Sequence, residues 1–112
     1  MNKTIFLITF YSLFLSFFFN QKVNAINFEN GKKLFESNCI ACHEAGINII
    51  IPEKNLKKET LEANGMYSLK AITYQVVNGK NGMPAFGSRL KEVEIEEIAD
   101  YVLFEAQNNF QE

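Results

Sequence analysis

The chain has 112 residues, with eleven lysine and arginine residues against thirteen aspartate and glutamate residues, and a formal net charge of −2 at pH 7. A slightly acidic chain of this length forms one small domain, and its charge excludes a protein that binds nucleic acid through a basic surface. Its only two cysteines and its only histidine lie together in one short segment. The sequence contains no internal repeat and no low-complexity segment.

Residues 1–25 have the composition of an export signal that is removed from the mature protein. Lys3 supplies a positive start, an apolar run follows from Ile5 to Phe19, and Val23-Asn24-Ala25 resembles a small-residue cleavage site. The apolar run is shorter than the roughly 20 residues needed to span a bilayer, so we expect no stable membrane insertion after cleavage. No twin-arginine pair is present, so we expect the general secretory route. Residues 26–112 remain as one acidic domain.

Cys39-Ile40-Ala41-Cys42-His43 forms a C-x-x-C-H motif, the attachment site of c-type haem. Two thiols three positions apart on a helical turn can each form a thioether to the haem, and the adjacent imidazole can bind the iron. A thioredoxin-like redox pair would follow a strand, and nothing strand-like precedes Cys39. Zinc would need a fourth ligand, for which only carboxylates remain. The motif predicts one covalent haem c on Cys39 and Cys42, with His43 as the proximal iron ligand.

Helical patterns without a convincing strand predict an all-α domain of four to five short helices wrapped around the haem. The expected helices cover residues 28–37, 56–63, 69–77 and 93–106, and Asn27 and Ser68 are expected N-caps. Gly31 inside the first helix costs about 1 kcal/mol relative to alanine, which favours a close helix contact there. Because a domain of this size has a thin hydrophobic core, the haem is expected to stabilise it.

The segment from Asn78 to Gly87 is too rich in glycine and asparagine for a helix, and its backbone can wrap closely around a flat group. Met83 offers a thioether in this segment, a soft ligand suited to the sixth position of haem iron. Met66 is the competing donor. Met83 is preferred because it lies in a pliant glycine-rich loop before a proline, whereas Met66 lies beside a helix end.

The loop of residues 44–55, which contains Pro52, follows the proposed proximal ligand. Pro52 has no backbone N–H, but a carbonyl in this loop can accept a hydrogen bond from Nδ1 of His43. Such a bond selects the tautomer that presents Nε2 to the iron. We therefore expect this loop to lie beside the haem.

Acidic residues crowd the start of the expected last helix, namely Glu92, Glu94, Glu96, Glu97 and Asp100. Acids near a helix N-terminus are favoured by the helix dipole, so the plain interpretation is a solvated and stabilised helix start. The alternative is a docking surface that steers the protein to a basic partner.

The chain resembles the cytochrome c6 family over residues 26–106. Besides the C-x-x-C-H motif, the resemblance rests on Lys57-Lys58-Glu59 to Glu62-Ala63-Asn64, Ala71 to Val76, Asn78 to Asn81, Met83 to Gly87, and Arg89-Leu90. It implies a small class I cytochrome c fold with His43 and Met83 as the axial ligands. It also implies that the first helix packs on the last, with its Gly31/Phe35 face on the Ile98/Tyr101 face.

The resemblance assigns roles to further residues. Gln75 and Arg89 match residues that line the haem environment and the partner-facing surface, and Phe110 stands where a tryptophan is usual. Without haem we expect an under-filled core, with a cavity lined by Ile51, Tyr74, Gln75 and Met83.

The function implied by the resemblance is soluble one-electron transport from the cytochrome b6f complex to photosystem I. The implied location is the thylakoid lumen of an algal chloroplast, with a cyanobacterial lumen or a bacterial periplasm as alternatives. The alternative function is a periplasmic respiratory cytochrome c that delivers electrons to a terminal oxidase. An enzyme is not expected, because iron held by both His43 and Met83 has no open position for a substrate.

Overall fold

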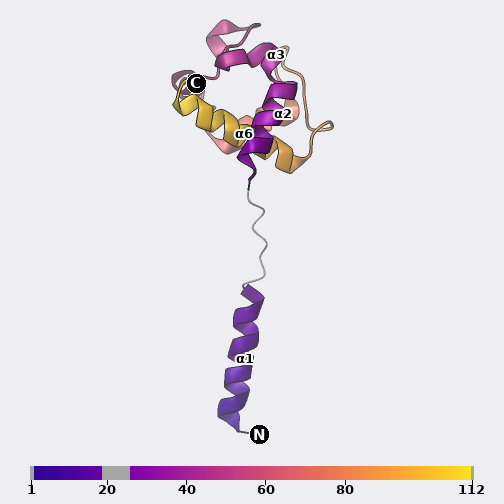
Figure 1. The fold of residues 1–112 in the computed structure, drawn as a ribbon, viewed down its shortest axis with the longest axis vertical. Coiled ribbons are helices and arrows are strands. Elements are labelled where there is room, and N and C mark those ends of the chain that lie inside the picture. Colours follow the sequence, from indigo (N-terminus) through magenta and orange to yellow (C-terminus); the bar gives the residue numbers. More distant parts are fainter. Residues whose placement is uncertain (1, 19–25, 112) are drawn as a thin grey trace.

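The computed structural model describes residues 2–18 and 26–111, which are helical apart from loops and one isolated β-bridge between Lys80 and Met83. This confirms the all-α prediction, and the expected helix boundaries hold to within one turn. The elements in chain order are α1 (Lys3–Phe18), α2 (Phe28–Asn38), α3 (Ile40–His43), the 3₁₀ turns η1 (Glu44–Gly46) and η2 (Pro52–Lys54), α4 (Lys58–Ala63), α5 (Leu69–Asn78) and α6 (Glu92–Gln107), as Figure 1 shows.

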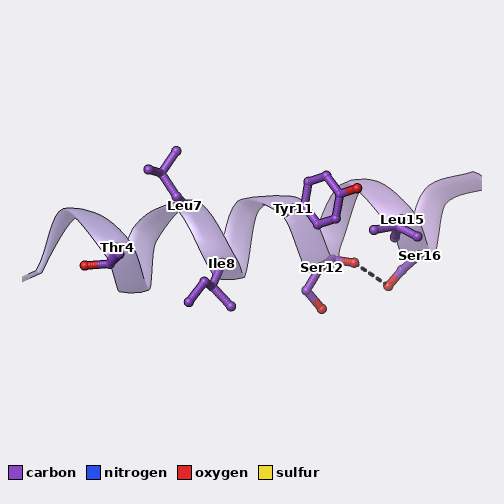
Figure 2. A pocket seen from close by; sticks show the side chains of 7 residues that line it. All are labelled: Thr4, Leu7, Ile8, Tyr11, Ser12, Leu15 and Ser16. Carbon is purple, nitrogen blue, oxygen red and sulfur yellow. Dashed lines mark hydrogen bonds between the residues drawn. The ribbon is translucent and has the colours of Figure 1, made fainter.

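Helix α1 carries the apolar run of the expected export signal, and all of its described side chains are exposed. A hollow on one side is lined by this helix alone, and there the hydroxyl of Ser16 donates to the carbonyl of Ser12 at 2.8 Å (Figure 2). A hollow formed by a single exposed helix encloses no site. Within the described residues, no helix is both long enough and apolar enough to cross a membrane. The expected cleavage site at Val23 to Ala25 lies outside the described residues.

Helices α2 and α6 pack directly against each other (Figure 1). A Cβ atom added at Gly31 would lie 2.1 Å from the carbonyl oxygen of Glu97, so a larger residue cannot take this position without a shift of the helices. Next to this contact, the rings of Phe35 and Tyr101 have their centroids 5.3 Å apart. The close helix contact predicted from Gly31 is therefore confirmed.

The two predicted N-caps are also confirmed. The side chain of Asn27 accepts from the N–H of Asn30, and the hydroxyl of Ser68 accepts from the N–H of Ala71, each at 3.1 Å. Each cap pairs one of the amide groups that a helix leaves free at its start, which stabilises the helix by about 1 kcal/mol. The caps fix the first residues of α2 and α5.

The hydrophobic core lies among α2, α4, α5 and α6. Its buried members are Phe35, Leu61, Ile72, Val76, Phe86, Ile95, Ile98, Ala99, Tyr101, Val102 and Ala106. Phe110 packs against this core and closes it near Gly46, where an added Cβ would lie 2.5 Å from the Phe110 ring. The phenyl ring of Phe110 thus lies directly against Gly46.

Candidate haem site

A cavity of about 610 Å³ opens beside the core and brings together residues from both ends of the domain. Cys42 and His43 line it from α3, Cys39 from the position just before this helix, and Met83 from the loop after α5. The volume lies within the range of about 300–1,000 Å³ typical of cofactor pockets. Most of the remaining wall is apolar, and its members include Phe35, Leu56, Leu61, Ile72, Val76, Phe86, Ile98 and Val102. The predicted under-filled core is therefore present.

The two thiols and the imidazole are presented by a single turn of helix. The N–H of Cys39 donates to the carbonyl of Phe35 at 2.8 Å and closes α2, while the N–H groups of Cys42 and His43 donate to the carbonyl of Cys39 at 3.2 and 2.9 Å. Positions three and four residues apart share one helix face, which is why all three side chains reach the cavity.

Both cysteines are free thiols, so each sulfur is available for a bond to another group. Burial, and to a smaller extent the neighbouring Cys42, raises the pKa of Cys39 to about 11. The Cys39 thiol of the haem-free chain is therefore protonated at neutral pH.

The imidazole of His43 is oriented by a backbone carbonyl of the following loop. Its Nδ1 lies 2.9 Å from the carbonyl oxygen of Ile47. Since a carbonyl can only accept, Nδ1 carries the proton and Nε2 keeps its lone pair for a metal. The loop turns back to allow this contact through Ala45 and Gly46, which have φ of 51° and 75°. The predicted carbonyl contact is confirmed, and its acceptor is Ile47.

Asn48 shapes the cavity wall beside His43, a role that the sequence analysis missed. Its side-chain oxygen accepts from the N–H groups of Ile50 and Ile51 at 3.0 and 2.9 Å, and its amide donates to the carbonyl of Lys54 at 3.1 Å. Asparagine in a loop commonly closes such local turns, so its residue type was the available signal.

Met83 is presented by a tight turn. Lys80 and Met83 exchange two backbone hydrogen bonds of 3.0 Å around Asn81 and Gly82, whose φ values are 47° and 91°. Positive φ at both central residues defines the turn for which Asn-Gly is the preferred pair, so this dipeptide was a sequence signal for it. The side-chain amide of Gln75 lies 3.8 Å from the Met83 sulfur and donates to it.

The chain after Met83 is attached to the end of α5. The N–H groups of Phe86 and Gly87 donate to the carbonyls of Val76 and Val77 at 2.9 and 3.2 Å. These carbonyls would otherwise be unpaired at the helix end. The attachment holds the Met83 side of the cavity against the core.

The remaining predicted site residues have different outcomes. Gln75 and Arg89 line the cavity, and the guanidinium of Arg89 lies 4.4 Å from the ring centroid of Phe86. Pro52 is exposed at the start of η2 and is not among the lining residues. The expected position of Tyr74 was wrong, because its side chain is 71% exposed on the outer face of α5. Met66 lines the cavity as well as Met83.

The predicted acidic surface needs a correction at Glu97, which is only 6% exposed. Its carboxylate accepts from the side-chain amide of Asn30 at 2.6 Å and from the N–H of Asn27 at 3.3 Å. Glu97 lies on the face of α6 that packs against α2, whereas Glu92 is exposed and Glu96 is half-buried. Glu97 is therefore part of the helix interface and not of the surface.

Comparisons with known proteins show the family to which this chain belongs. Residues 27–102 match the family described as cytochrome C oxidase, cbb3-type, subunit III. Cytochrome c6 of Bumilleriopsis filiformis is 57% identical over 82 residues, which are 73% of this chain and 95% of the relative. Cytochrome c6 of Cyanidium caldarium is 46% identical over 106 residues, which are 95% of this chain and 96% of the relative.

A solved structure has the same fold. Cytochrome c6 from the diatom Phaeodactylum tricornutum aligns with a TM-score of 0.72 and 46% identity, over 74% of this chain and 98% of that protein. The fold is that of the small class I cytochromes c, and its cofactor is a single covalently bound haem c. The cavity, with two free thiols, an imidazole and two thioethers on its wall, fits that group. The chain belongs to the cytochrome c6 family of electron-carrying c-type cytochromes.

Proposed function

We propose that this protein carries single electrons from the cytochrome b6f complex to photosystem I, with its haem iron held between His43 and Met83. One observation carries the proposal: these two residues lie far apart in the sequence, yet both line the cavity that also holds Cys39 and Cys42. In this proposal the two thiols form the thioethers. The haem, when bound, supplies a reversible ferric/ferrous couple.

The surrounding residues support a carrier more than an enzyme. The carbonyl of Ile47 holds His43 with Nε2 free, and the amide of Gln75 holds the sulfur of Met83. If His43 and Met83 both hold the haem iron, a substrate would have no coordination site. The apolar wall keeps water away, and a thioether ligand together with burial favours the ferrous state. These residues thus set a potential and do not provide a reaction site.

The rim of the cavity supports brief docking to a partner. Ile50 lines the cavity and is 54% exposed, and Ile49 beside it is 58% exposed. Pro84, which also lines the cavity, is exposed as well. A small apolar rim with charges further away favours fast and short-lived contacts, which a carrier needs.

The proposed location is the thylakoid lumen of an algal chloroplast, reached after cleavage behind Ala25. The algal relative from Bumilleriopsis is covered to 95% by an 82-residue alignment, so its length is close to that of residues 26–112. The 106-residue alignment with the Cyanidium relative must extend into residues 1–25. These lengths support a processed domain and a leader that relatives share. The alternative locations are a cyanobacterial lumen and a bacterial periplasm.

The test is flash-induced oxidation of the reduced holoprotein by photosystem I membranes. We expect oxidation whose rate rises with protein concentration and saturates. The alternative function is that of a respiratory carrier that delivers electrons to a terminal oxidase. The match of residues 27–102 to an oxidase subunit family is the observation that supports this alternative. Oxidation by oxidase-containing membranes without any response to the flash would overturn the photosynthetic route and support the respiratory one.

A further inference from the structure

Glu97 carries a buried carboxylate that the haem site does not use. It lies on α6 where this helix contacts Gly31 near the start of α2, and it is not among the residues that line the haem cavity. Its Oε2 accepts from the side-chain amide of Asn30 at 2.6 Å, and its Oε1 accepts from the backbone N–H of Asn27 at 3.3 Å. The carboxylate thus faces the first residues of α2.

The described residues leave this carboxylate without a cation. Among them, the structure shows one ion pair, between Lys58 and Glu62 at 3.6 Å on the surface. A carboxylate has about four acceptor positions, and described residues fill two of those of Glu97. The positive end of the α2 dipole compensates part of the charge. A buried charge is costly unless it is fully paired, so this site favours a further cationic donor.

The chain itself has a source for this cation. Ile26 directly precedes Asn27, and consecutive backbone nitrogens lie less than about 4 Å apart. Since the nitrogen of Asn27 is 3.3 Å from Oε1 of Glu97, the nitrogen of Ile26 lies within about 7 Å of this oxygen in any conformation of the peptide, and a small rotation can bring it into contact. In the precursor this nitrogen belongs to a neutral peptide bond.

We propose that Glu97 is the binding site for the α-ammonium group that leader removal creates at Ile26. The inference rests on the proposed cleavage after Ala25. Hydrolysis of the Ala25–Ile26 peptide bond consumes one water and leaves a carboxylate on Ala25 and an ammonium group on Ile26. The new ammonium donates to the free acceptor positions of Glu97 and ties the start of α2 to α6. Processing therefore stabilises the helix pair on which the haem domain is built.

The test compares unfolding of the holoprotein that starts at Ile26, with its α-amine either free or acetylated. We expect acetylation to raise the unfolding equilibrium constant in urea by about 5- to 30-fold, a range that corresponds to about 1–2 kcal/mol. In Glu97→Gln the same acetylation should have no effect, because the partner charge is gone. Glu96→Gln is the matched control, since Glu96 is the neighbouring acid of α6, and it should keep the full response to acetylation.

A second variant keeps Glu97 intact and does not depend on how well Glu97→Gln folds. One alanine added before Ile26 moves the ammonium away by one residue, and it should destabilise the protein as acetylation does. Equal acetylation effects in wild type and in Glu97→Gln would overturn the ion pair. Mass spectrometry of the natural N-terminus tests the cleavage site separately from the ion pair. A mature chain that starts at a residue other than Ile26 would refute the cleavage site. A chain that starts at Ile26 but shows no effect of acetylation would refute only the ion pair between Glu97 and the α-ammonium group.

Discussion

The side-chain amide of Gln75 donates to the sulfur of Met83 across 3.8 Å, from α5 to the loop that follows it. A donor on a ligand sulfur withdraws electron density from the iron that this sulfur binds. In the proposed ligation, Gln75 therefore favours ferrous iron and raises the reduction potential. The contact connects a residue of α5 with the thioether of the loop that follows this helix.

Replacing Gln75 by leucine should lower the reduction potential. A neutral hydrogen bond is worth about 0.5–1.5 kcal/mol, which corresponds to roughly 20–60 mV for one electron. Potentiometric titration of the holoprotein measures the shift. Tyr74→Phe is the control, because Tyr74 is the adjacent residue but is 71% exposed and lies outside the cavity. An unchanged potential in Gln75→Leu would show that the amide does not act on the ligand.

Met83→Ala and Met66→Ala distinguish the two thioethers that line the cavity. Met83→Ala should abolish the weak near-infrared band of the sulfur–iron bond and lower the potential, because the distal ligand is lost. Met66→Ala should leave the band in place and mainly reduce stability, by about 2–5 kcal/mol if the cavity cannot relax. Absorption spectra of the ferric protein show whether the near-infrared band is present in each variant. Loss of the band in Met66→Ala alone would reverse the ligand assignment.

Gly31→Ala should destabilise the protein strongly. The added Cβ would lie 2.1 Å from the carbonyl oxygen of Glu97, and the helices must separate to accept it. Overpacking of this kind costs about 1–3 kcal/mol, visible as a lower urea midpoint. Gly65→Ala is the comparison, since Gly65 has φ of 65° but no atom within 4 Å of an added Cβ. Gly65→Ala should lower the free energy of unfolding by only roughly 1–2 kcal/mol, which is the cost of the left-handed backbone conformation for alanine. A Gly31→Ala protein as stable as wild type would disprove the tight helix contact.

The acidic start of α6 should steer the protein toward a basic partner. Because Glu97 is buried, the appropriate charge reversal is Glu92→Lys with Glu96→Lys. We expect slower association with photosystem I at low salt, by roughly 10- to 1,000-fold, and no difference near 1 M salt, where the Debye length is about 3 Å. Stopped-flow or flash kinetics over a salt series measure this.

The control for that pair is Glu29→Lys with Glu36→Lys, the same charge change on exposed positions of α2. If both double variants slow association equally, the change in net charge explains the slower association, and the position of the glutamates on α6 does not matter. If neither does, the glutamates of α6 serve only the helix start.

The sequence by itself determined the features that depend on neighbours along the chain. The C-x-x-C-H spacing places Cys39, Cys42 and His43 on one turn of helix because positions three and four apart share a face. Asn27 and Ser68 cap their helices through hydrogen bonds to amides three residues away. Gly31 signalled a close contact because its cost in a helix interior needs a compensating gain.

Only the tertiary structure decided which face of each helix is buried and which distant groups meet. Glu97 reads as a surface acid in the sequence, yet the crossing of α2 over α6 buries it against Asn30. Tyr74 has an aromatic side chain suited to a cavity, but its position on α5 points it to solvent. Met66 lines the cavity together with Met83. Such outcomes follow from helix packing, which depends on long-range contacts that the order of residues along one helix does not encode.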